Sequence, residues 1–414
     1  MSADAVRVGR PVWLPSRGGR KPPAYPVLRG DLSADVVVVG GGFTGSAVAA
    51  LFAEAGVRVC VLDAAAVGRG STAASTALLL QEPDLGLLDL ERRYGPAASR
   101  RIWQLSHDAA RGLAATLRRL RIDCDLAARP SIYYTTSGPA VESLRAEHRH
   151  RCAVGFDGTW LTPGALRRRT GMAGRGAIET RGNAAFDPFK ASVGLMAAAV
   201  AHGAHVFERS AVRRIERDGA GVRVHTANGQ VVASQVIVAT GYATPDFRPL
   251  AGRFRMHHTY VLATEPLDEA QRRELGLGNV LLWDTDRPYH YVRWTDDQRL
   301  LIGGEDRPVD PRRRRATQFR DATRQLRAHF EALLPALADI RTDYAWEGLF
   351  AMTPDSLPYI GPHRRYPRHL FALGYGGNGM TFGFMAARML LEHWQGRASP
   401  DHALFSFTRA AGRA

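Results

Sequence analysis

Cysteine is scarce and long apolar runs are absent in this chain of 414 residues. Cys60, Cys124 and Cys152 are the only cysteines, which argues against a disulfide framework and is typical of a reducing compartment. No apolar run approaches the roughly 20 residues that a transmembrane helix needs, and residues 1–34 lack the apolar core of a secretory signal. We therefore expect a cytoplasmic protein without a membrane span.

Lysine is almost absent as well, since Lys21 and Lys190 are the only two. The formal net charge of +15 is thus carried almost wholly by arginine, and such an excess can indicate binding to nucleic acid. The densest run, Arg312–Arg315, is short, has no aromatic residues between the arginines and leads into a predicted amphipathic helix. We interpret the excess as arginines spread over solvated faces and expect no nucleic-acid partner.

Residues 35–63 contain the most informative pattern of the chain, DVVVVGGGFTGSAVAALFAEAGVRVCVLD. Four valines predict a strand that is buried on both faces. Gly40, Gly42 and Gly45 then form a G-x-G-x-x-G pattern, followed by apolar residues at helical spacing, a second apolar strand and Asp63. This order is typical of a dinucleotide-binding strand–helix–strand unit, whereas the glycines alone would also fit a structural turn.

Each part of the unit has a physical reason. Gly40 permits the tight turn, Gly42 lets a pyrophosphate approach the backbone, and Gly45 lets the helix pack closely on the sheet. Phe43 and Thr44 lie between these glycines at the start of the helix, where free N–H groups face the phosphates, and we include both among the cofactor-binding residues. Asp63 stands where a carboxylate can accept hydrogen bonds from ribose hydroxyls.

The rest of the chain predicts alternating helices and short strands. Helices are expected at residues 85–120, 141–152, 189–202 and 316–334, a meander of short strands at 204–233, and a buried strand at 236–241. Short aromatic-rich strands between residues 255 and 345 indicate a separate antiparallel sheet. The segments GRGSTAAST (68–76) and GYGGNGMT (374–381) are small-residue turns that suit contact with a phosphate or a ring.

Together these pieces resemble the FAD-dependent oxidoreductases of the D-amino acid oxidase and glycine oxidase type, and in particular the branch that contains γ-glutamylputrescine oxidase. The resemblance rests on GGGFTG with Asp63, GRGSTAAST, YVRWTDDQRLLIGGED, and WEGLFAMTPDSLPYIG with GYGGNGMTFG, which follow the family's order along nearly the whole chain. It implies an α/β fold with a three-layer ββα Rossmann-like FAD-binding domain and an interleaved antiparallel-sheet substrate domain. The implied parts are an irregular N-terminal arm (1–34), a discontinuous FAD-binding domain (35–84, 140–250 and 346–414) and a substrate domain (85–139 and 251–345).

The resemblance also implies where FAD lies. Its pyrophosphate would contact Gly40, Gly42 and Gly45, and its adenosine ribose would contact Asp63. The candidate contacts near the pyrophosphate and the isoalloxazine ring are Arg69, Gly70, Ser71 and Thr72. Val212 would lie beside the adenine, and the backbone at Gly241 would pass close to the cofactor. The second glycine turn would stabilise negative charge on the reduced ring through Gly376, Gly377, Asn378, Gly379, Met380 and Thr381.

The implied chemistry is oxidation of a C–N bond in a small amine or amino acid, with hydride transfer to flavin N5 and hydrolysis of the imine. Arg293 matches the family's carboxylate-binding arginine, although it could instead pair with Asp284, Asp286 or Asp296. Tyr289 and Tyr291 could line the substrate pocket or fill the core. His258, or its neighbour His257, could tune the ring or relay a proton, although a structural histidine is the commoner case.

Two departures from the family refine these expectations. No cysteine follows Cys152, which excludes the thioether link found near the TPD motif of some sarcosine oxidases. We therefore expect FAD to be bound non-covalently. We also expect no metal. The lysine that those enzymes place beside N5 has no counterpart, because neither Lys21 nor Lys190 lies in the matching segment. The electron acceptor, oxygen or another molecule, and the oligomeric state therefore stay open. An NAD(P)-dependent dehydrogenase and a non-catalytic FAD-binding protein are the alternatives.

Overall fold

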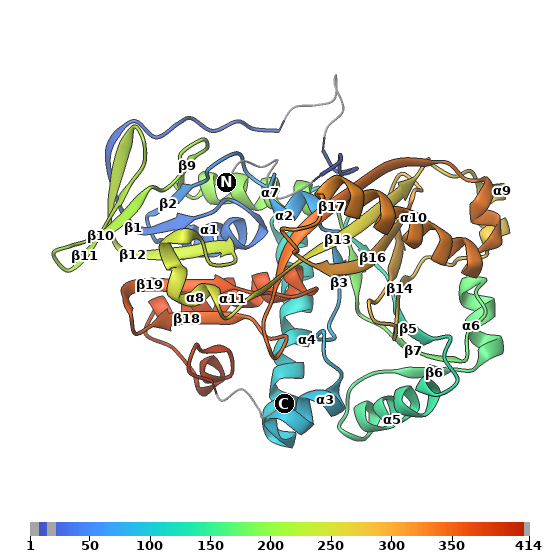
Figure 1. Cartoon of the computed structure of the whole chain (residues 1–414). Helices are drawn as coiled ribbons and strands as arrows, with labels where there is room; N and C mark the ends of the chain where they lie inside the picture. Colours follow the sequence, from blue (N-terminus) through green and yellow to red (C-terminus); the bar gives the residue numbers. More distant parts are fainter. Residues whose placement is uncertain (1–7, 15–21, 410–414) are drawn as a thin grey trace.

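The computed structural model describes residues 8–14 and 22–409. Two large sheets dominate the fold, and in Figure 1 the first lies on the left and the second on the right. No helix of the described ranges is long and apolar enough to cross a membrane. This mixed α/β architecture confirms the expected fold class.

The first sheet has the order β10-β11-β12-β1-β2-β9, with β19 paired to β12 and β18 paired to β19. β1 pairs in parallel with β2 and β12, while β10 and β11 form an antiparallel meander against the first half of β12. β19 pairs in parallel with the second half of β12. The strands are β1 (Gly30–Val39), β2 (Val59–Leu62), β9 (His205–Phe207), β10 (Arg214–Asp218), β11 (Gly221–His225), β12 (Gly229–Gly241), β18 (Tyr359–His363) and β19 (Tyr366–Leu373).

The second sheet has the order β17-β13-β16-β15-β14-β5-β7-β6. Its pairs are antiparallel except for β5 and β14, which run parallel, so the sheet is mixed and mostly antiparallel. The strands are β5 (Ser131–Thr135), β6 (Thr159–Leu161), β7 (Gly176–Thr180), β13 (Arg255–Thr264), β14 (Leu281–Asp284), β15 (Tyr291–Trp294), β16 (Leu300–Pro308) and β17 (Thr342–Met352). A small third sheet contains β3 (Leu78–Leu79), β4 (Ala127–Ala128) and β8 (Ala184–Ala185).

The helices pack through their apolar residues, α1, α7 and α11 with the first sheet and α10 on the second. α1 packs between α7 and α11, and all three are rich in Ala, Val, Leu, Phe or Met and belong to one buried cluster with the first sheet. α10 packs on β13 and β16 through one face, on which Gln318, Ala322, Leu326 and Phe330 recur at every fourth position. The helices are α1 (Phe43–Glu54), α2 (Ser71–Ala74), α3 (Leu87–Tyr94), α4 (Pro96–Arg119), α5 (Ala140–Ala153), α6 (Pro163–Thr170), α7 (Pro188–Ala201), α8 (Arg248–Ala251), α9 (Glu269–Leu275), α10 (Arg315–Leu333) and α11 (Gly379–Trp394).

Several predicted boundaries differ from the structure. The helix expected at residues 85–120 is two helices, because Gly95 has φ 78° and ends α3 before α4 begins. β6 and β7 belong to the second sheet although residues 140–250 were assigned to the first domain, and the boundary at residue 346 falls inside β17. β6 and β7 have three and five residues, and nothing local to them shows which sheet they join.

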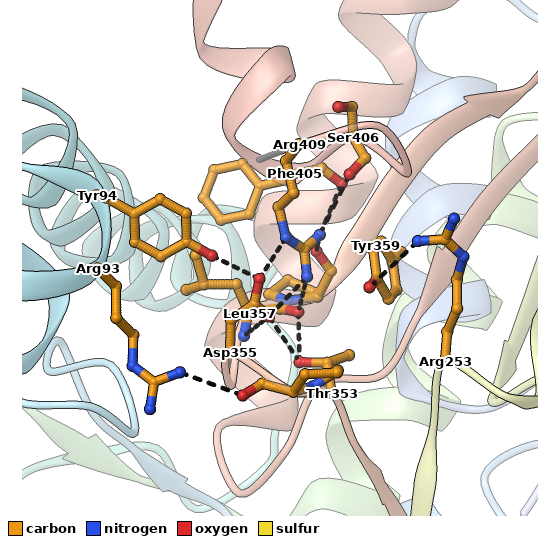
Figure 2. A network of polar contacts seen from close by, with 12 residues as sticks. Arg93, Tyr94, Arg253, Thr353, Asp355, Leu357, Tyr359, Phe405, Ser406 and Arg409 are labelled. Atoms are coloured by element: carbon orange, nitrogen blue, oxygen red, sulfur yellow. Dashed lines mark hydrogen bonds and ion pairs between the residues drawn. The ribbon is translucent and has the colours of Figure 1, made fainter. Parts of the chain in front are cut away.

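A buried ion pair ties the end of the described chain to the loop after β17 (Figure 2). Arg409 donates through Nε to Asp355 Oδ2 at 2.7 Å and through Nη2 to Asp355 Oδ1 at 2.8 Å, and Tyr94 Oη donates to Asp355 Oδ2 at 2.5 Å. Each charged side chain is only 3% exposed, and the guanidinium carbon lies 3.9 Å from the ring centroid of Tyr359. Asp355 belongs to the TPD motif, so the structure gives this motif a role in holding the loop.

We expect Arg409→Ala to lower the free energy of unfolding by about 3–5 kcal/mol, because it leaves the Asp355 carboxylate buried without its partner. Denaturant unfolding checks this. Arg58→Ala is the control, since the Arg58–Asp35 pair is exposed and should contribute little. Equal destabilisation by the two substitutions would contradict the buried pair's importance.

The same pair predicts a pH dependence of stability. Burial acts to raise the pKa of Asp355. The hydrogen bonds that Arg409 donates and the positive charge of Arg409 outweigh burial, and the pKa is lowered to about 2. The folded-state pKa is therefore below the unfolded value of about 3.9. The stabilisation should be complete above about pH 4 and lost as the pH falls toward 2, and Arg409→Ala should reduce this acid-dependent part.

Candidate functional site

A cavity of about 890 Å³ lies where the two sheets meet. Its walls come from both ends of the chain and from the middle, including the turn after β1, the segment around α2, the end of β12, strands β13 to β17 and the turn before α11. Its volume is in the range of pockets that bind cofactors and substrates.

The turn between β1 and α1 leaves no room for side chains. Gly40 has φ +106°, and a Cβ on Gly45 would lie 1.8 Å from the carbonyl oxygen of Gly40. The helix α1 therefore approaches the strand as closely as two backbones can. Gly42 is the N-cap of α1 and lines the cavity, so the N-terminal end of the helix lies at the cavity wall.

Asp63 lies beside this turn and lines the cavity. Its Oδ2 accepts a hydrogen bond from Gly41 N at 2.7 Å, and its Oδ1 accepts one from Ala65 N at 2.7 Å. Burial raises the pKa of Asp63, although these two backbone hydrogen bonds act in the opposite direction. Each oxygen keeps a free lone pair, so the carboxylate can also accept hydrogen bonds from ribose hydroxyls.

The segment around α2 forms the neighbouring wall. Thr72 Oγ1 accepts a hydrogen bond from Phe43 N at 2.8 Å, and Ser71 Oγ donates to Leu349 O at 2.9 Å. These bonds link the segment to α1 on one side and to β17 on the other. Gly70, Ser71 and Thr72 line the cavity, whereas Arg69 is not among the lining residues.

The second glycine turn reaches the same cavity from the C-terminal part of the chain. Gly377 N donates to Asp84 Oδ2 at 2.7 Å, and Asn378 Nδ2 donates to Glu82 O at 2.8 Å. α11 begins at Gly379, so its N-terminus also faces the cavity. Thr381, which was expected to contact the cofactor, is fully buried and donates to Leu80 O at 2.7 Å.

Most of the predicted cofactor-binding residues therefore meet in one place, although their contact with FAD stays a prediction. The lining residues among them are Gly40, Gly42, Phe43, Thr44, Asp63, Gly70, Ser71, Thr72, Val212, Gly241, Gly376, Gly377, Asn378, Gly379 and Met380. Gly45, Arg69 and Thr381 lie outside the lining. Gly45 still serves the site, because it permits the close approach of α1 to the turn.

The structure places Arg293 away from the cavity that it was predicted to serve, so its contact with a substrate stays a prediction without geometric support. The side chain is buried outside the cavity lining, where Nε donates to Thr76 O at 2.5 Å, Nη2 to Phe186 O at 2.8 Å and Nη1 to Trp294 O at 3.1 Å. These partners are backbone carbonyls and not one of the aspartates named as the alternative. Burial lowers the pKa of Arg293 to about 9.

The other two predicted catalytic residues, Tyr291 and His258, differ in their position relative to the cavity. Tyr291 lines the cavity, and its hydroxyl lies 3.1 Å from Thr259 Oγ1. His258 does not, since successive residues of β13 face opposite sides of the sheet and it is His257 that lines the cavity. His258 Nδ1 lies 3.3 Å from Glu347 Oε1, and burial together with the charge of Arg315 lowers the pKa of His258 to about 4. The predicted catalytic role of His258 therefore has no geometric support.

Four ionisable residues near the cavity resemble a metal site in their residue types. Potential ligand atoms of Asp284, Asp286, His290 and His329 lie within 4.8 Å of one another. His290 Nδ1 and Asp284 Oδ2 are 2.9 Å apart, so a hydrogen bond accounts for the closeness of these two. None of the four lines the cavity.

Sequence reasoning missed several residues of the cavity wall, namely Asp84, Trp283, Arg287 and Asp306. Asp306 is the last residue of the YVRWTDDQRLLIGGED segment, and its place in this motif was the one sign in the sequence that it could belong to the site. Asp84 belongs to no motif, and only the folded chain brings it beside the glycine turn at residue 377.

Comparison with known proteins agrees with this geometry. The chain matches the family described as DAO, FAD dependent oxidoreductase, over residues 35–393. It is 29% identical over 384 residues to the gamma-glutamylputrescine oxidoreductase of Escherichia coli (strain K12), covering 90% of this chain and 86% of that protein. It is 25% identical over 367 residues to a glycine oxidase of Bacillus licheniformis, covering 86% of this chain and 93% of that protein. The crystal structure of glycine oxidase from Geobacillus kaustophilus shares the fold, with a TM-score of 0.78 at 22% identity over 92% of this chain and 100% of that chain.

The close approach at the first turn yields a testable expectation. Gly45→Ala should displace α1 from the Gly40 carbonyl and cost about 1–3 kcal/mol of stability, with loss of bound flavin measured as the ratio of flavin to protein absorbance. Gly252→Ala is the matched control, since its Cβ would meet nothing within 4 Å and its φ is −66°. Normal flavin content in Gly45→Ala would contradict the packing argument.

The position of Arg293 yields a second expectation. Arg293→Met should leave three buried carbonyls without their donor and lower the free energy of unfolding by about 1–3 kcal/mol. The dissociation constant for carboxylate ligands such as glycine should stay within the range of the control, Arg255→Met, which changes an exposed arginine of β13. A selective loss of carboxylate binding at unchanged stability would restore the substrate role of Arg293.

Proposed function

The chain belongs to the DAO family of FAD-dependent oxidoreductases and has FAD as its cofactor, and from that premise we propose that it oxidises the C–N bond of an amine or amino acid with FAD held non-covalently. The observation that carries this proposal is the meeting of two glycine turns, at Gly40–Gly45 and Gly376–Gly379, in one cavity. The names of similar proteins, gamma-glutamylputrescine oxidoreductase and glycine oxidase, support the substrate class.

The residues of the cavity fit FAD. The glycine-lined turn before α1 offers backbone N–H groups to a pyrophosphate, and Asp63 offers a carboxylate to a ribose. Val212 and Gly241 line the part of the cavity contributed by the first sheet. No cysteine lines the cavity in the part of the chain that the structure describes, in keeping with a non-covalent cofactor.

When bound, FAD accepts a hydride from the carbon next to the substrate nitrogen, and water hydrolyses the imine that results. The N-terminus of α11 begins at Gly379 and directs partial positive charge into the cavity, which stabilises negative charge on a reduced ring. Tyr289 and Tyr291 line the side of the cavity formed by the second sheet, where they can orient a substrate. Reoxidation uses oxygen or another acceptor.

We expect the purified protein to be yellow and to release its flavin into the supernatant on acid precipitation, because the link is non-covalent. Anaerobic addition of the correct amine should bleach the flavin band, and a screen over D-amino acids, glycine, N-methyl amino acids and polyamine derivatives finds it. Hydrogen peroxide formed on admitting air distinguishes an oxidase from a dehydrogenase.

Three results would overturn the proposal. A flavin that stays with the precipitated protein would show a covalent link. Bound flavin that no substrate reduces would indicate a non-catalytic FAD-binding protein. Folded protein without flavin, but with affinity for NAD(P), would indicate a nicotinamide-dependent dehydrogenase.

A further inference from the structure

The wall of the cavity beside the second glycine turn carries two carboxyl groups, Asp84 and Asp306. Asp84 is fitted to the turn, because a Cβ on Gly376 would lie 2.3 Å from Asp84 Oδ2. A Cβ on Gly377 would lie 2.5 Å from the hydroxyl of Tyr289. The absence of side chains at these glycines thus makes room for an acid and a tyrosine at the cavity wall.

Asp306 has an unused hydrogen-bonding atom. Its Oδ1 is buried and has no hydrogen-bond partner among the described residues. Burial raises the pKa of Asp306 to about 7, the charges of Asp84 and Glu305 act in the same direction, and Thr259 and His290 act against it. A buried acceptor without a partner is costly, and a ligand that donates a hydrogen bond would remove that cost.

The same wall has no free counter-charge. Among the residues that the structure describes, Arg287 is the only arginine or lysine that lines the cavity. Arg287 is exposed, and its Nη1 donates to Asp286 O at 2.7 Å. Burial raises the pKa of Asp84 to about 6 even though the charge of Arg287 acts to lower it. The charge of Asp84 acts to raise the pKa of Asp306, so the two acids interact, and the charge of Arg287 does not bring the pKa of Asp84 back to its usual range.

The neighbouring polar and aromatic atoms suit an amine. Asn378 is 4% exposed, lines the cavity and has an Oδ1 with no hydrogen-bond partner among the described residues. Trp283, another lining residue, stacks on Tyr133 with ring centroids 3.9 Å apart. Acceptor oxygens and aromatic faces both attract an ammonium group, and aromatic faces also pack against an alkyl chain.

We propose that Asp84 and Asp306 select alkyl amines that have no carboxylate on the reacting carbon, by binding the ammonium group between them. An α-amino acid would instead bring its carboxylate against two acids, because Arg293 is committed to backbone carbonyls and Arg287, the remaining guanidinium of this wall among the described residues, is exposed and lies beside Asp84. Once the amine is bound, the Asp306 carboxylate can accept the ammonium proton, which leaves the nitrogen with its lone pair. This inference rests on the proposed function and names its substrate class.

The test uses two ligands of similar shape that cannot be oxidised, because neither has hydrogen on the carbon that bears nitrogen. tert-Butylamine is a simple ammonium ion at neutral pH, and α-aminoisobutyrate replaces one of its methyl groups by a carboxylate. Calorimetric titration of the holoenzyme at about pH 8 should show tert-butylamine binding at least about tenfold more tightly. Tighter or equal binding of α-aminoisobutyrate would overturn the proposal.

Two substitutions test whether Asp84 and Asp306 cause the preference for tert-butylamine. Asp306→Asn and Asp84→Asn should each weaken tert-butylamine binding by about tenfold or more and narrow its advantage over α-aminoisobutyrate. Asp310→Asn is the matched control, because this acid follows β16, pairs with exposed Arg312 and does not line the cavity. Flavin content equal to that of the wild type verifies folding. Unchanged selectivity in both cavity variants would overturn the proposal.

The pH dependence provides a separate readout. Only the ionised acids attract an ammonium ion, so wild-type affinity for tert-butylamine should fall as the pH is lowered from about 8 to about 6 and the acids take up protons. In Asp306→Asn the part of this fall near pH 7 should be lost. A fall of the same size and midpoint in the variant would exclude Asp306 as its origin.

Substrates that can be oxidised distinguish a failure of the amine preference from a failure of the proposed function. n-Butylamine should reduce the flavin faster under anaerobic conditions than D- or L-norvaline, which carries an added carboxylate on the same carbon. Reduction by norvaline or glycine but not by n-butylamine would overturn the amine preference and leave the proposed function standing. Failure of every amine and amino acid would overturn the proposed function, while the titrations still decide the binding preference.

Discussion

The contact between the start of α1 and the turn after β1 is the constraint on which the site depends. A side chain at Gly45 would have its Cβ 1.8 Å from the Gly40 carbonyl oxygen, so the helix can reach this position only with glycine there. α1 in turn packs against α7 and α11. Because α11 begins at the second glycine turn, the position of α1 also determines where that turn meets the cavity.

The second sheet supplies the other half of the cavity, and the alternation of side chains along its strands decides which residues face a ligand. On β13 His257 faces the cavity, whereas His258 lies near Glu347. On β15 Tyr291 and Arg293 are two residues apart and share one face of the sheet, and here position along the strand decides: Tyr291 lines the cavity, whereas Arg293 donates to the Thr76 carbonyl oxygen. Arg293 thus holds the wall that contains Ser75, Thr76 and Ala77. The Asp355–Arg409 pair does the same for the loop after β17.

The balance of charge within the cavity differs from that of the whole chain. The chain has a formal net charge of +15, yet the part of the cavity near Asp84 and Asp306 has acids with raised pKa values and one exposed guanidinium, that of Arg287. Burial accounts for this difference, since an arginine on a solvated surface costs little, whereas a buried acid without a partner changes its pKa. Selectivity for an amine follows from this local balance and not from the net charge.

The sequence by itself determined the strand–helix–strand unit, the family and the cofactor, because the unit depends on residues that are close together in the chain and the family on short motifs that follow one another in a fixed order. Gly40, Gly42, Gly45 and Asp63 span one such unit, and their spacing reflects the geometry of a single turn and helix. Only the tertiary structure decided the direction of Arg293, the choice of His257 over His258 at the cavity, and the meeting of Asp84 with Asp306. These depend on strand pairing across long separations in sequence, and a shift of one residue along a strand would exchange the faces.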